Sequence, residues 1–387
     1  MHVVIIPSWY SNDENNVLGS FFREQAKALG EAGVNVTIAY NEIIPLYKYG
    51  KFKIIFKNRI SRNFEYGLDT YRYKDYNYYL HSNIRFLFFA KRIEKLLRKI
   101  EMEKGKIDLL HFHSCFWAGM CAEYLKKIFS IPYIITEHTG ICSSKYVKPK
   151  HMKKIKSAYD NSFALIAVSN SLKNELKLIS NNENLYVIHN FLDSKIFKPI
   201  DKFKFNGNVF KFFSLAFLVD GKGFSNLINS CKMLRDSGYE FVLEIGGDGY
   251  LRDKLEKQVN ENNLKDNVKF LGMLNREEVI VKMNECHSFI MVSEYETFGV
   301  VYIESLACGK PVIGVKNGGV EDIIVDKNLG ILIDECNETK ILNAMIDMIK
   351  NYKFYDSIKI REYFLKNFEK TNIIDKLKDV YKNCLSN

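Results

Sequence analysis

One segment of the chain combines two glutamates with the start of a predicted helix. It begins at Ser293 and reads SEYETFGVVYIESLACGKPVIGVKNGGVEDII. The apolar run before it, HSFIMVS, predicts a β-strand, and Thr297 is placed to cap a helix that runs through Glu304 until Gly309 and Pro311 end it. A helix that begins where a strand ends leaves its first N–H groups without acceptors. The segment therefore predicts a binding site for an anion.

The two glutamates flank the amides that would bind this anion. Free amides are expected from Phe298 to Val300, and phosphate is the group that such amides bind best. Glu296 lies just outside the predicted helix and Glu304 about two turns along it, roughly 12 Å away at ~1.5 Å per residue. Carboxylates so placed accept hydrogen bonds from hydroxyls on either side of a diphosphate. Gly318 and Gly319 are expected to let a second loop approach the ligand.

The elements that must position these residues form a repeating pattern in the first half of the chain. Strands are expected at His2–Pro7, Val34–Tyr40, Asp108–His113, Pro132–Glu137, Phe163–Val168 and Leu185–His189. Helices are expected at Ser20–Glu31, Ile84–Glu103, Trp117–Phe129 and Ser171–Ile179. This alternation predicts βαβ units, a parallel sheet and helices on both of its faces.

The pattern restarts after a turn at residues 199–208. Further strands are expected at Phe210–Phe217, Phe241–Ile245, Val268–Leu271, Ser288–Val292 and Pro311–Val315. We therefore predict an α/β protein with two Rossmann-like domains, residues 1–198 and 199–370, and a final helix within 371–387 that crosses back to the first domain. Open parallel sheets bind ligands at the carboxyl ends of their strands, so the chemistry is expected in a cleft that the two sheets face.

These motifs resemble those of glycosyltransferase family 4, retaining enzymes of the GT-B architecture. The resemblance is carried by E-T-F-G-x(4)-E-S-L-A-C-G-x-P-V-I followed by G-G-x-x-D. The family's glycine loop corresponds to PSWYSNDENNVLGSFFREQAKAL, its strand ending in histidine to ITEHTG, and its interdomain segment to VIHNFLDSKIFKP. Its second glycine turn and base-binding loop correspond to IGGDGYLRDKLE and VKFLGMLNREEV. The resemblance extends over nearly the whole chain.

The resemblance implies a nucleotide diphosphate sugar as donor and assigns catalytic roles to Glu296, His138 and Lys222. Lys222 would bear the charge of the leaving diphosphate, while Glu296 and His138 would hold the sugar. Glu304 would accept hydrogen bonds from the ribose. The other donor-binding residues implied are Gly19, Ser20, Gly247, Leu274, Thr297, Phe298, Gly299 and Val300.

One position departs from the family pattern. In FKFFSLAFLVDGKGF, Phe217 stands where the family has an arginine, five residues before Lys222. Losing one cation from a leaving-group clamp costs a few kcal/mol of transition-state stabilisation, by order of magnitude. Either another cation replaces it, with Lys211, Arg23 and Lys316 as candidates, or the acceptor site supplies the charge.

Three further patterns narrow the reaction. The chain has no D-x-D motif, so neither a metal nor another cofactor is expected. Neither GKG at 221–223 nor GGDG at 246–249 completes a Walker or dinucleotide motif. His111 and His113, on alternate positions of one strand, are better interpreted as core histidines than as ligands. Two alternatives stay open: a non-hydrolysing UDP-sugar 2-epimerase, whose arginine- and glutamate-rich motif we do not find, and a non-catalytic subunit, which Phe217 favours.

The positive charge is concentrated in residues 41–106. This segment has 16 Lys/Arg against 7 Asp/Glu, a net charge of +9 out of +10 for the whole chain, and its aromatic and basic residues alternate. Such a face suits an anionic membrane surface. The alternative is a solvated helix face over core aromatics. No nucleic-acid motif accompanies the charge, so nucleic acid is not expected as a partner. The acceptor we expect is a cell-envelope or exported glycan, lipid-linked, with a UDP-sugar as the preferred donor.

The composition predicts a folded cytoplasmic protein, peripheral at most to the inner face of a membrane. Of its 387 residues 47% are apolar and 26% charged, enough for two cores. The start, MHVVIIPSWY, predicts a first strand rather than a signal peptide. No apolar run reaches the ~18 residues that a membrane span needs. The eight cysteines form no C-x-x-C pair, and we interpret them as buried thiols.

Overall fold

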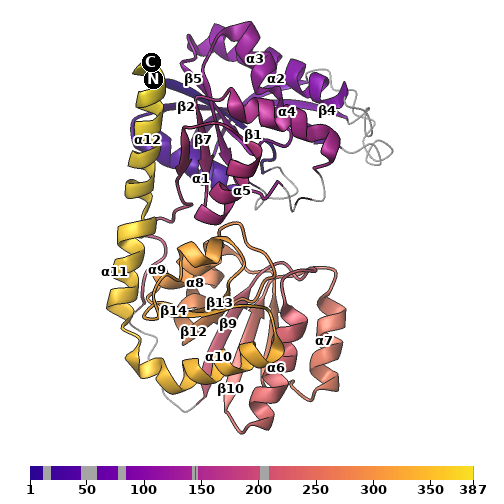
Figure 1. Ribbon diagram of the computed structural model, residues 1–387, viewed down its shortest axis with the longest axis vertical. Coiled ribbons are helices and arrows are strands. Elements are labelled where there is room, and N and C mark those ends of the chain that lie inside the picture. The colour runs from indigo at the N-terminus through magenta and orange to yellow at the C-terminus, as the bar shows by residue number, and fades with distance from the viewer. Residues whose placement is uncertain are drawn as a thin grey trace. The chain divides into compact units, whose positions relative to one another are not determined.

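The computed structural model describes residues 1–11, 19–44, 59–76, 84–141, 144, 147–200 and 209–386. The chain divides into two compact units (Figure 1). Unit 1 consists of Met1–Val168, Leu172–Ile188 and Ile374–Asn387, and unit 2 of Ser169–Ser171 and His189–Ile373. The division thus follows Ile188 rather than residue 198, and a three-residue piece of the α5 region belongs to unit 2.

Unit 1 is built on an eight-stranded sheet of order β3-β4-β2-β1-β5-β6-β7-β8. The strands are β1 (His2–Pro7), β2 (Asn35–Ile44), β3 (Ile60–Glu65), β4 (Leu68–Tyr76), β5 (Leu109–His113), β6 (Tyr133–Glu137), β7 (Ala164–Ala167) and β8 (Leu185–Val187). Every neighbouring pair is parallel except β3 and β4, which form an antiparallel hairpin. All residues of β1, β5, β6 and β7 are buried, as expected for a parallel sheet covered on both faces.

The helices of unit 1 are amphipathic and bury their apolar faces. They are α1 (Ser20–Glu31), α2 (Ile84–Lys104), α3 (Ala122–Phe129), α4 (Pro149–Asp160) and α5 (Asn170–Ile179), with a 3₁₀ turn η2 (Gly119–Cys121) before α3. The last helix, α12 (Lys370–Ser386), contributes its residues from Ile374 onward to unit 1. There the Lys378 ammonium donates to the carbonyl oxygen of Ala32 at 3.1 Å.

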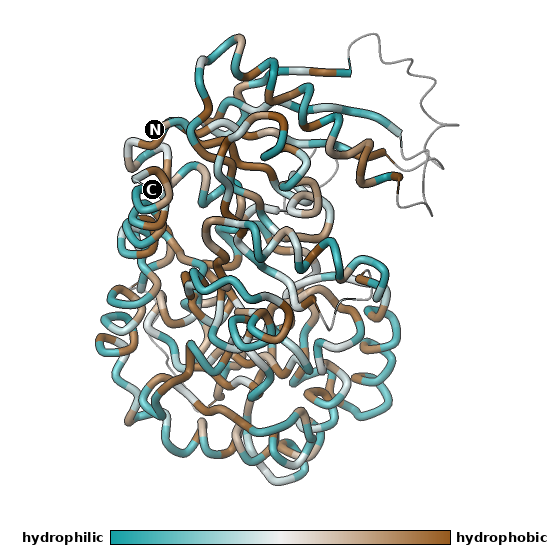
Figure 2. Tube along the Cα trace, turned by 45° about the horizontal axis from the view of Figure 1, so that its top comes forward, coloured by the Kyte–Doolittle hydropathy of each residue, from teal (hydrophilic) through white to brown (hydrophobic). Residues whose placement is uncertain are grey.

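Unit 2 is built on a six-stranded, all-parallel sheet of order β11-β10-β9-β12-β13-β14. The strands are β9 (Phe210–Leu215), β10 (Phe241–Gly246), β11 (Val268–Gly272), β12 (Ser288–Ile290), β13 (Val312–Val315) and β14 (Gly330–Ile333). The helices are α6 (Phe224–Asp236), α7 (Arg252–Glu261), α8 (Arg276–Glu285), α9 (Val300–Ala307), α10 (Glu338–Asn351) and α11 (Ser357–Phe368), with 3₁₀ turns η3 (Gly319–Asp322) and η4 (Tyr352–Phe354). Figure 2 shows hydrophobic segments mainly in the interior of each unit and hydrophilic ones over its outside.

Five features of the fold differ from the sequence-based expectation. β3, β4, β14 and α4 were not expected, and α3 starts at Ala122 rather than Trp117 because η2 precedes it. β3 is solvent-facing and lacks apolar alternation, while β4 mixes tyrosines with charges. β3 is an edge strand with no fully buried residue, so burial imposes no apolar alternation on its sequence.

In the described part of the basic segment 41–106, most of the acidic residues are engaged in ion pairs with its cations. Glu42 and Glu65 pair with Arg72, Asp75 pairs with Arg92, and other acids of β4 and α2 pair similarly. Phe86 and Phe89 of α2 are buried in the core. This agrees with core aromatics beneath a solvated face. The cation-rich stretches at 45–58 and 77–83, on which membrane contact depends most, lie outside the described residues.

None of the helices in the described part of the chain combines the length and hydrophobicity that a bilayer crossing requires. The seven cysteines that the structure describes are free thiols, and all but the half-buried Cys336 are buried. Burial raises the pKa of the Cys121 and Cys286 thiols to about 12, so both stay protonated. Cys142 lies outside the described residues.

Candidate functional site

Lys222 and Glu296, two of the predicted catalytic residues, form an ion pair in unit 2. Lys222 lies in the turn after β9, between Gly221 (φ 82°) and Gly223 (φ 72°). A Cβ on Gly223 would lie 2.2 Å from the carbonyl oxygen of Val292, so only glycine fits beside the end of β12. The turn brings the Lys222 ammonium to 2.5 Å from Oε1 of Glu296. Without a ligand, the cation and the carboxylate neutralise one another.

The backbone at Glu296 is fixed by the G-G pair that follows β13. Glu296 forms a parallel bridge with Gly318, and the N–H of Gly319 donates to the Glu296 carbonyl at 2.8 Å. A Cβ on Gly318 would lie 2.6 Å from that carbonyl oxygen, and one on Gly319 would lie 2.2 Å from the Thr297 carbonyl oxygen. The role of these glycines toward a ligand stays a prediction, and the structure gives a second reason for them. They make room for residues 296–298.

The helix that carries Glu304 begins later than predicted. α9 starts at Val300, and its N-cap is Gly299 at φ 92° with no side-chain cap, so the expected capping role of Thr297 is wrong. Glycine adopts this left-handed conformation without strain and takes the place of a capping side chain. The free amides of the helix begin at Val300. The ring of Phe298 is buried and stacks on His189 at 5.4 Å between centroids.

Three buried polar atoms near this helix have no partner among the described residues. They are Oε2 of Glu304, Oγ of Ser293 and Oδ1 of Asn317. The side-chain amide of Asn317 donates to the carbonyl of Ser293, so these two residues are adjacent. Burial raises the pKa of Glu304 to about 7, partly offset by the charge of Arg276. Unpartnered buried polar groups are costly, and such a group at a strand end is an acceptor ready for a ligand.

Ser293 and Asn317 were not singled out from the sequence. Ser293 lies three residues after β12 and Asn317 two residues after β13, and a polar residue just past a buried strand was the available signal. Gly247 and Leu274, which were predicted, follow β10 and β11 in the same way. Gly247 (φ 117°) donates its N–H to the carbonyl of Gly272 at 2.7 Å, and a Cβ on it would lie 1.9 Å from the carbonyl oxygen of Ala216.

Phe217, at the position of the family arginine, is 53% exposed in the loop after β9. Of the three candidate replacements, Lys211 is excluded because it lies near the amino end of β9, beside His287, at the opposite edge of the sheet from Lys222. Lys316 directly follows β13, is exposed, and its N–H donates to the Ile333 carbonyl at 2.7 Å. It therefore lies at the correct edge. Arg23 belongs to unit 1, where its guanidinium lies 4.1 Å over the ring of Tyr66.

The predicted glycine loop of unit 1 ends at the start of α1. Gly19 (φ 68°) is the N-cap of α1 and Ser20 its first residue. A Cβ on Gly19 would lie 2.8 Å from the carbonyl oxygen of Trp9, so a glycine is required where the loop returns to the end of β1. Residues 12–18 of the loop lie outside the described residues.

His138 directly follows β6 and is held among buried rings. Its Nε2 lies 3.0 Å from Nδ1 of His113, at the end of the neighbouring β5. The rings of Phe21 and Phe22 lie 4.8 and 4.9 Å from it. The preceding carboxylate, Glu137, accepts from the backbone N–H groups of Cys115, His138 and Thr139 and from the hydroxyls of Thr139 and Tyr159. Glu137 therefore fixes the backbone from which the His138 ring projects.

The two histidines of LLHFHS behave differently. His111 is a core histidine, because Nδ1 is bonded to the Tyr381 hydroxyl of α12 at 2.7 Å and Nε2 to Oγ1 of Thr136 at 2.8 Å. His113 is bonded only through Nδ1, and its buried Nε2 has no partner among the described residues. Burial lowers the pKa of His113 to about 3 and holds those of His111 and His138 well below the ordinary value, so all three rings are neutral near pH 7.

The aspartate of G-G-x-x-D, Asp322, has a structural role in unit 2. Its carboxylate accepts from the backbone N–H of Asn170 at 2.6 Å and from its side-chain amide at 3.2 Å, and lies 3.9 Å from Nδ1 of His189. Residues 169–171 and the segment from His189 enter unit 2 from unit 1. Asp322 therefore anchors two chain crossings to the loop that also holds Glu296.

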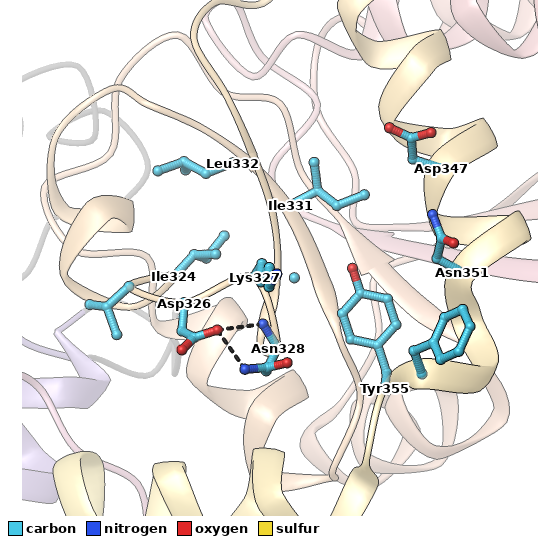
Figure 3. A pocket seen from close by; sticks show the side chains of 12 residues that line it. Ile324, Asp326, Lys327, Asn328, Ile331, Leu332, Asp347, Asn351 and Tyr355 are labelled. Carbon is cyan, nitrogen blue, oxygen red and sulfur yellow. Dashed lines mark hydrogen bonds between the residues drawn. The ribbon is translucent and has the colours of Figure 1, made fainter.

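A cavity of about 620 Å³ lies along the edge strand β14 (Figure 3). Its lining residues come from the loop before β14, from β14, and from α10 and η4. The loop is held by Asp326, which accepts from the backbone N–H of Asn328 at 2.8 Å and its amide at 2.7 Å. None of the predicted site residues lines this cavity, and it opens beside the amino end of β14, away from Lys222 and Glu296.

Sequence profiles match nearly the whole chain. The profile described as Glycosyltransferase Family 4 matches residues 18–195, and that described as Glycosyl transferases group 1 matches residues 196–367. An uncharacterised glycosyltransferase of Methanocaldococcus jannaschii is 30% identical over 290 residues, which cover 73% of this chain and 78% of that protein.

Solved structures with the same fold share little sequence. Sucrose-phosphate synthase from Thermosynechococcus elongatus superposes with a TM-score of 0.80 at 17% identity and covers 100% of both chains. The Anabaena protein HepE, in complex with UDP and glucose, superposes with a TM-score of 0.76 at 17% identity and covers 99% of this chain and 100% of its own. These likenesses extend through both units.

Proposed function

The chain belongs to glycosyltransferase family 4 and has the GT-B architecture, and on that premise we propose that it transfers a sugar from a UDP-sugar with retention of anomeric configuration. One observation carries the assignment of the donor site. Lys222 and Glu296 form an ion pair at the strand ends of unit 2, and the nearby helix α9 carries Glu304, whose buried Oε2 has no partner within the described residues. A cation for a diphosphate and acceptors for hydroxyls are the groups that a nucleotide sugar requires.

The residues act through electrostatics and positioning. The donor diphosphate displaces Glu296 from Lys222 and accepts from the amides at the start of α9. The released Glu296 carboxylate then accepts from the sugar hydroxyls, and Glu304 accepts from the ribose. Charge that builds on the leaving diphosphate is stabilised by Lys222, with Lys316 as the replacement for the missing family arginine. His138 of unit 1 supplies a further hydrogen bond to the donor sugar.

The choice of UDP is supported by the fold neighbour HepE, which was solved with UDP and glucose. The acceptor we propose is a cell-envelope or exported glycan, lipid-linked, at the inner face of a membrane. This part depends on the cationic, aromatic composition of residues 41–106, whose stretches 45–58 and 77–83 lie outside the described residues. Family membership favours a transferase over the 2-epimerase alternative.

Thermal unfolding with nucleotides tests the donor site. UDP at 100 times its dissociation constant should add about 2.7 kcal/mol to the free energy of unfolding. We expect a shift of the midpoint with UDP, UDP-glucose or UDP-N-acetylglucosamine in the wild type and a smaller shift in Glu304→Ala. GDP and GDP-mannose serve as the competing donor class. Absence of any shift with all five compounds would remove the proposal.

We propose that transfer needs no metal. Hydrolysis of the donor in the absence of an acceptor should persist in excess chelator. It is measured as the release of free nucleotide. Hydrolysis that stops in chelator and returns with Mn²⁺ would contradict this. The same assay in Glu296→Ala separates a catalytic site from simple nucleotide binding, because the variant should lose hydrolysis and retain nucleotide-dependent thermal stabilisation.

A further inference from the structure

We propose that His113 is a positioning residue that selects the tautomer of His138, so that His138 presents an N–H to the donor substrate. The inference rests on the proposed role of His138 in the donor site. His113 itself touches no substrate in this scheme. Its contribution passes through one hydrogen bond, between its Nδ1 and Nε2 of His138, at 3.0 Å.

The environment of the pair leaves the two rings few alternatives. His113 is fully buried and His138 is 9% exposed. Phe22 lies 4.8 Å from the His113 ring, and His111 lies 4.2 Å on another side of it. The nearest carboxylate in sequence, Glu137, directs both oxygens to backbone and hydroxyl donors. Across the 3.0 Å hydrogen bond, each of the two histidines is therefore the titratable partner of the other.

Two neutral imidazoles joined by one hydrogen bond have linked tautomers. Each neutral ring has one N–H and one lone pair, and the bond between the rings uses one of each. If Nδ1 of His113 donates, Nδ1 of His138 carries a proton and is a donor. If Nε2 of His138 donates instead, Nδ1 of His138 is an acceptor and Nε2 of His113 carries the proton. The chemistry offered by one ring therefore determines that of the other.

The free ends of the pair point to a ligand. Nδ1 of His138 and Nε2 of His113 are both buried and have no partner among the described residues. A buried N–H without an acceptor is costlier than a buried lone pair without a donor, so the outer N–H should be at the end that a ligand reaches. The His138 residue is 9% exposed, although its Nδ1 is itself covered, whereas His113 is fully buried, so a ligand can approach the ring of His138 more closely. We therefore assign the N–H to Nδ1 of His138, where it can donate to a sugar or phosphate oxygen.

The tautomers are measured by ¹⁵N NMR on protein labelled at its eight histidines, with the His138 signals assigned by their loss in His138→Gln. We expect protonated Nδ1 and unprotonated Nε2 at His138 in the wild type. In His113→Leu the selected form should be lost, and His113→Asn, whose side-chain amide can replace the Nδ1 donor, should restore it. His138 protonated at Nε2 in the wild type, or an unchanged tautomer in His113→Leu, would overturn the inference.

Kinetics of donor hydrolysis provide the second readout. We expect kcat to fall at least tenfold in His113→Leu, because a wrong tautomer removes the donor, and to recover within about threefold in His113→Asn. Tyr381→Phe is the matched control, since it removes a hydrogen bond to the neighbouring His111 and should lower the melting temperature with kcat unchanged. Full kcat in His113→Leu, with His138→Gln impaired, contradicts the inference. If the wild type turns over no UDP-sugar, the proposed function fails, and the NMR result still decides the tautomer.

Discussion

The polar groups that we propose as donor-binding differ in charge between the two units. Unit 2 presents charges, with Lys222 and Glu296 paired at 2.5 Å and Glu304 near its point of ionisation at pH 7. Unit 1 presents neutral rings, since burial keeps His113 and His138 unprotonated. A diphosphate needs charge compensation, whereas a neutral sugar needs oriented hydrogen bonds. The contrast teaches that burial, rather than residue type alone, decides which kind of recognition each unit offers.

The largest effect is expected from removing the cation of unit 2. Lys222→Met should lower kcat for donor hydrolysis by a factor on the order of 10² to 10³, because charge on the leaving diphosphate loses its compensation. Lys269→Met, at an exposed position of β11, is the matched control and should leave kcat unchanged. If Lys222→Met retains more than a third of wild-type kcat, the charge-based account of unit 2 is wrong.

Gly247, which directly follows β10, has a backbone conformation and surroundings that only glycine fits. Gly247→Ala should destabilise the protein by about 3 kcal/mol, since its φ is 117° and the added Cβ would lie 1.9 Å from the Ala216 carbonyl oxygen. Gly33→Ala in unit 1 has φ 84° but nothing within 4 Å, so it should cost only about 1 kcal/mol. The free energies of unfolding of both variants, measured with denaturant, check the difference. Equal losses of stability would show that the turn at Gly247 rearranges to accommodate the added Cβ.

Restoring the family arginine should strengthen the charged site. Phe217→Arg should tighten UDP binding about tenfold, roughly 1.4 kcal/mol, because an Arg–phosphate contact is charge-assisted. Phe217→Leu keeps the side chain apolar and serves as the control in the same titration calorimetry. Unchanged affinity in the arginine variant, together with weaker binding in Lys316→Met, would show that Lys316 already occupies the role.

The pH dependence of UDP binding should come from unit 2 and not from unit 1. With a pKa of about 7, Glu304 is mostly ionised at pH 8 and mostly protonated at pH 6, so UDP affinity should fall up to about tenfold over that range. His113, at a pKa of about 3, does not titrate there. Glu304→Gln should flatten the profile, and a slope retained in that variant would assign the titration to another group.

The pH dependence that Glu304 gives to the free energy of unfolding is opposite in sign to the one it gives to UDP affinity. The folded pKa of Glu304 lies above its ordinary value of 4.5, so the folded protein holds a proton that the unfolded chain releases. The contribution of Glu304 to the free energy of unfolding is therefore complete below about pH 4.5 and is lost as the pH rises through about 7. The free energy of unfolding of Glu304→Gln, measured with denaturant at about pH 4.5 and about pH 7, should lack this loss.

Much of the architecture could be predicted from the sequence, and the reasons for the failures are local. The alternation of apolar runs and amphipathic stretches located β1 and α1 at their observed bounds, and the family and the two-domain α/β fold were confirmed. Thr297 was assigned as the N-cap of α9 from its residue type. The N-cap is instead Gly299, two residues later, in the left-handed conformation. Such a choice depends on backbone angles that no propensity specifies.

The site residues show the same limit. The spacing of Glu296 and Glu304 was visible, whereas the pairing of Glu296 with Lys222 joins residues 74 apart and needs the strand order of unit 2. The difference between His111 and His113 was equally hidden, because Tyr381, the partner that satisfies His111, lies 270 residues away. Long-range partners of this kind follow from topology, and a single sequence does not encode them in any short pattern.

The placement of α12 affects the order in which the protein is completed during synthesis. Unit 1 contains both β1 and residues from Ile374 onward, which are translated after the whole of unit 2. All of unit 2 therefore leaves the ribosome before Tyr381 can reach His111. The sheet of unit 1 is covered by α12 only after unit 2 has been synthesised. A chain truncated after residue 373 should retain a unit 2 that resists proteolysis while unit 1 becomes sensitive. Residues beyond 373 thus govern when unit 1, whose sheet is synthesised before unit 2, completes its fold.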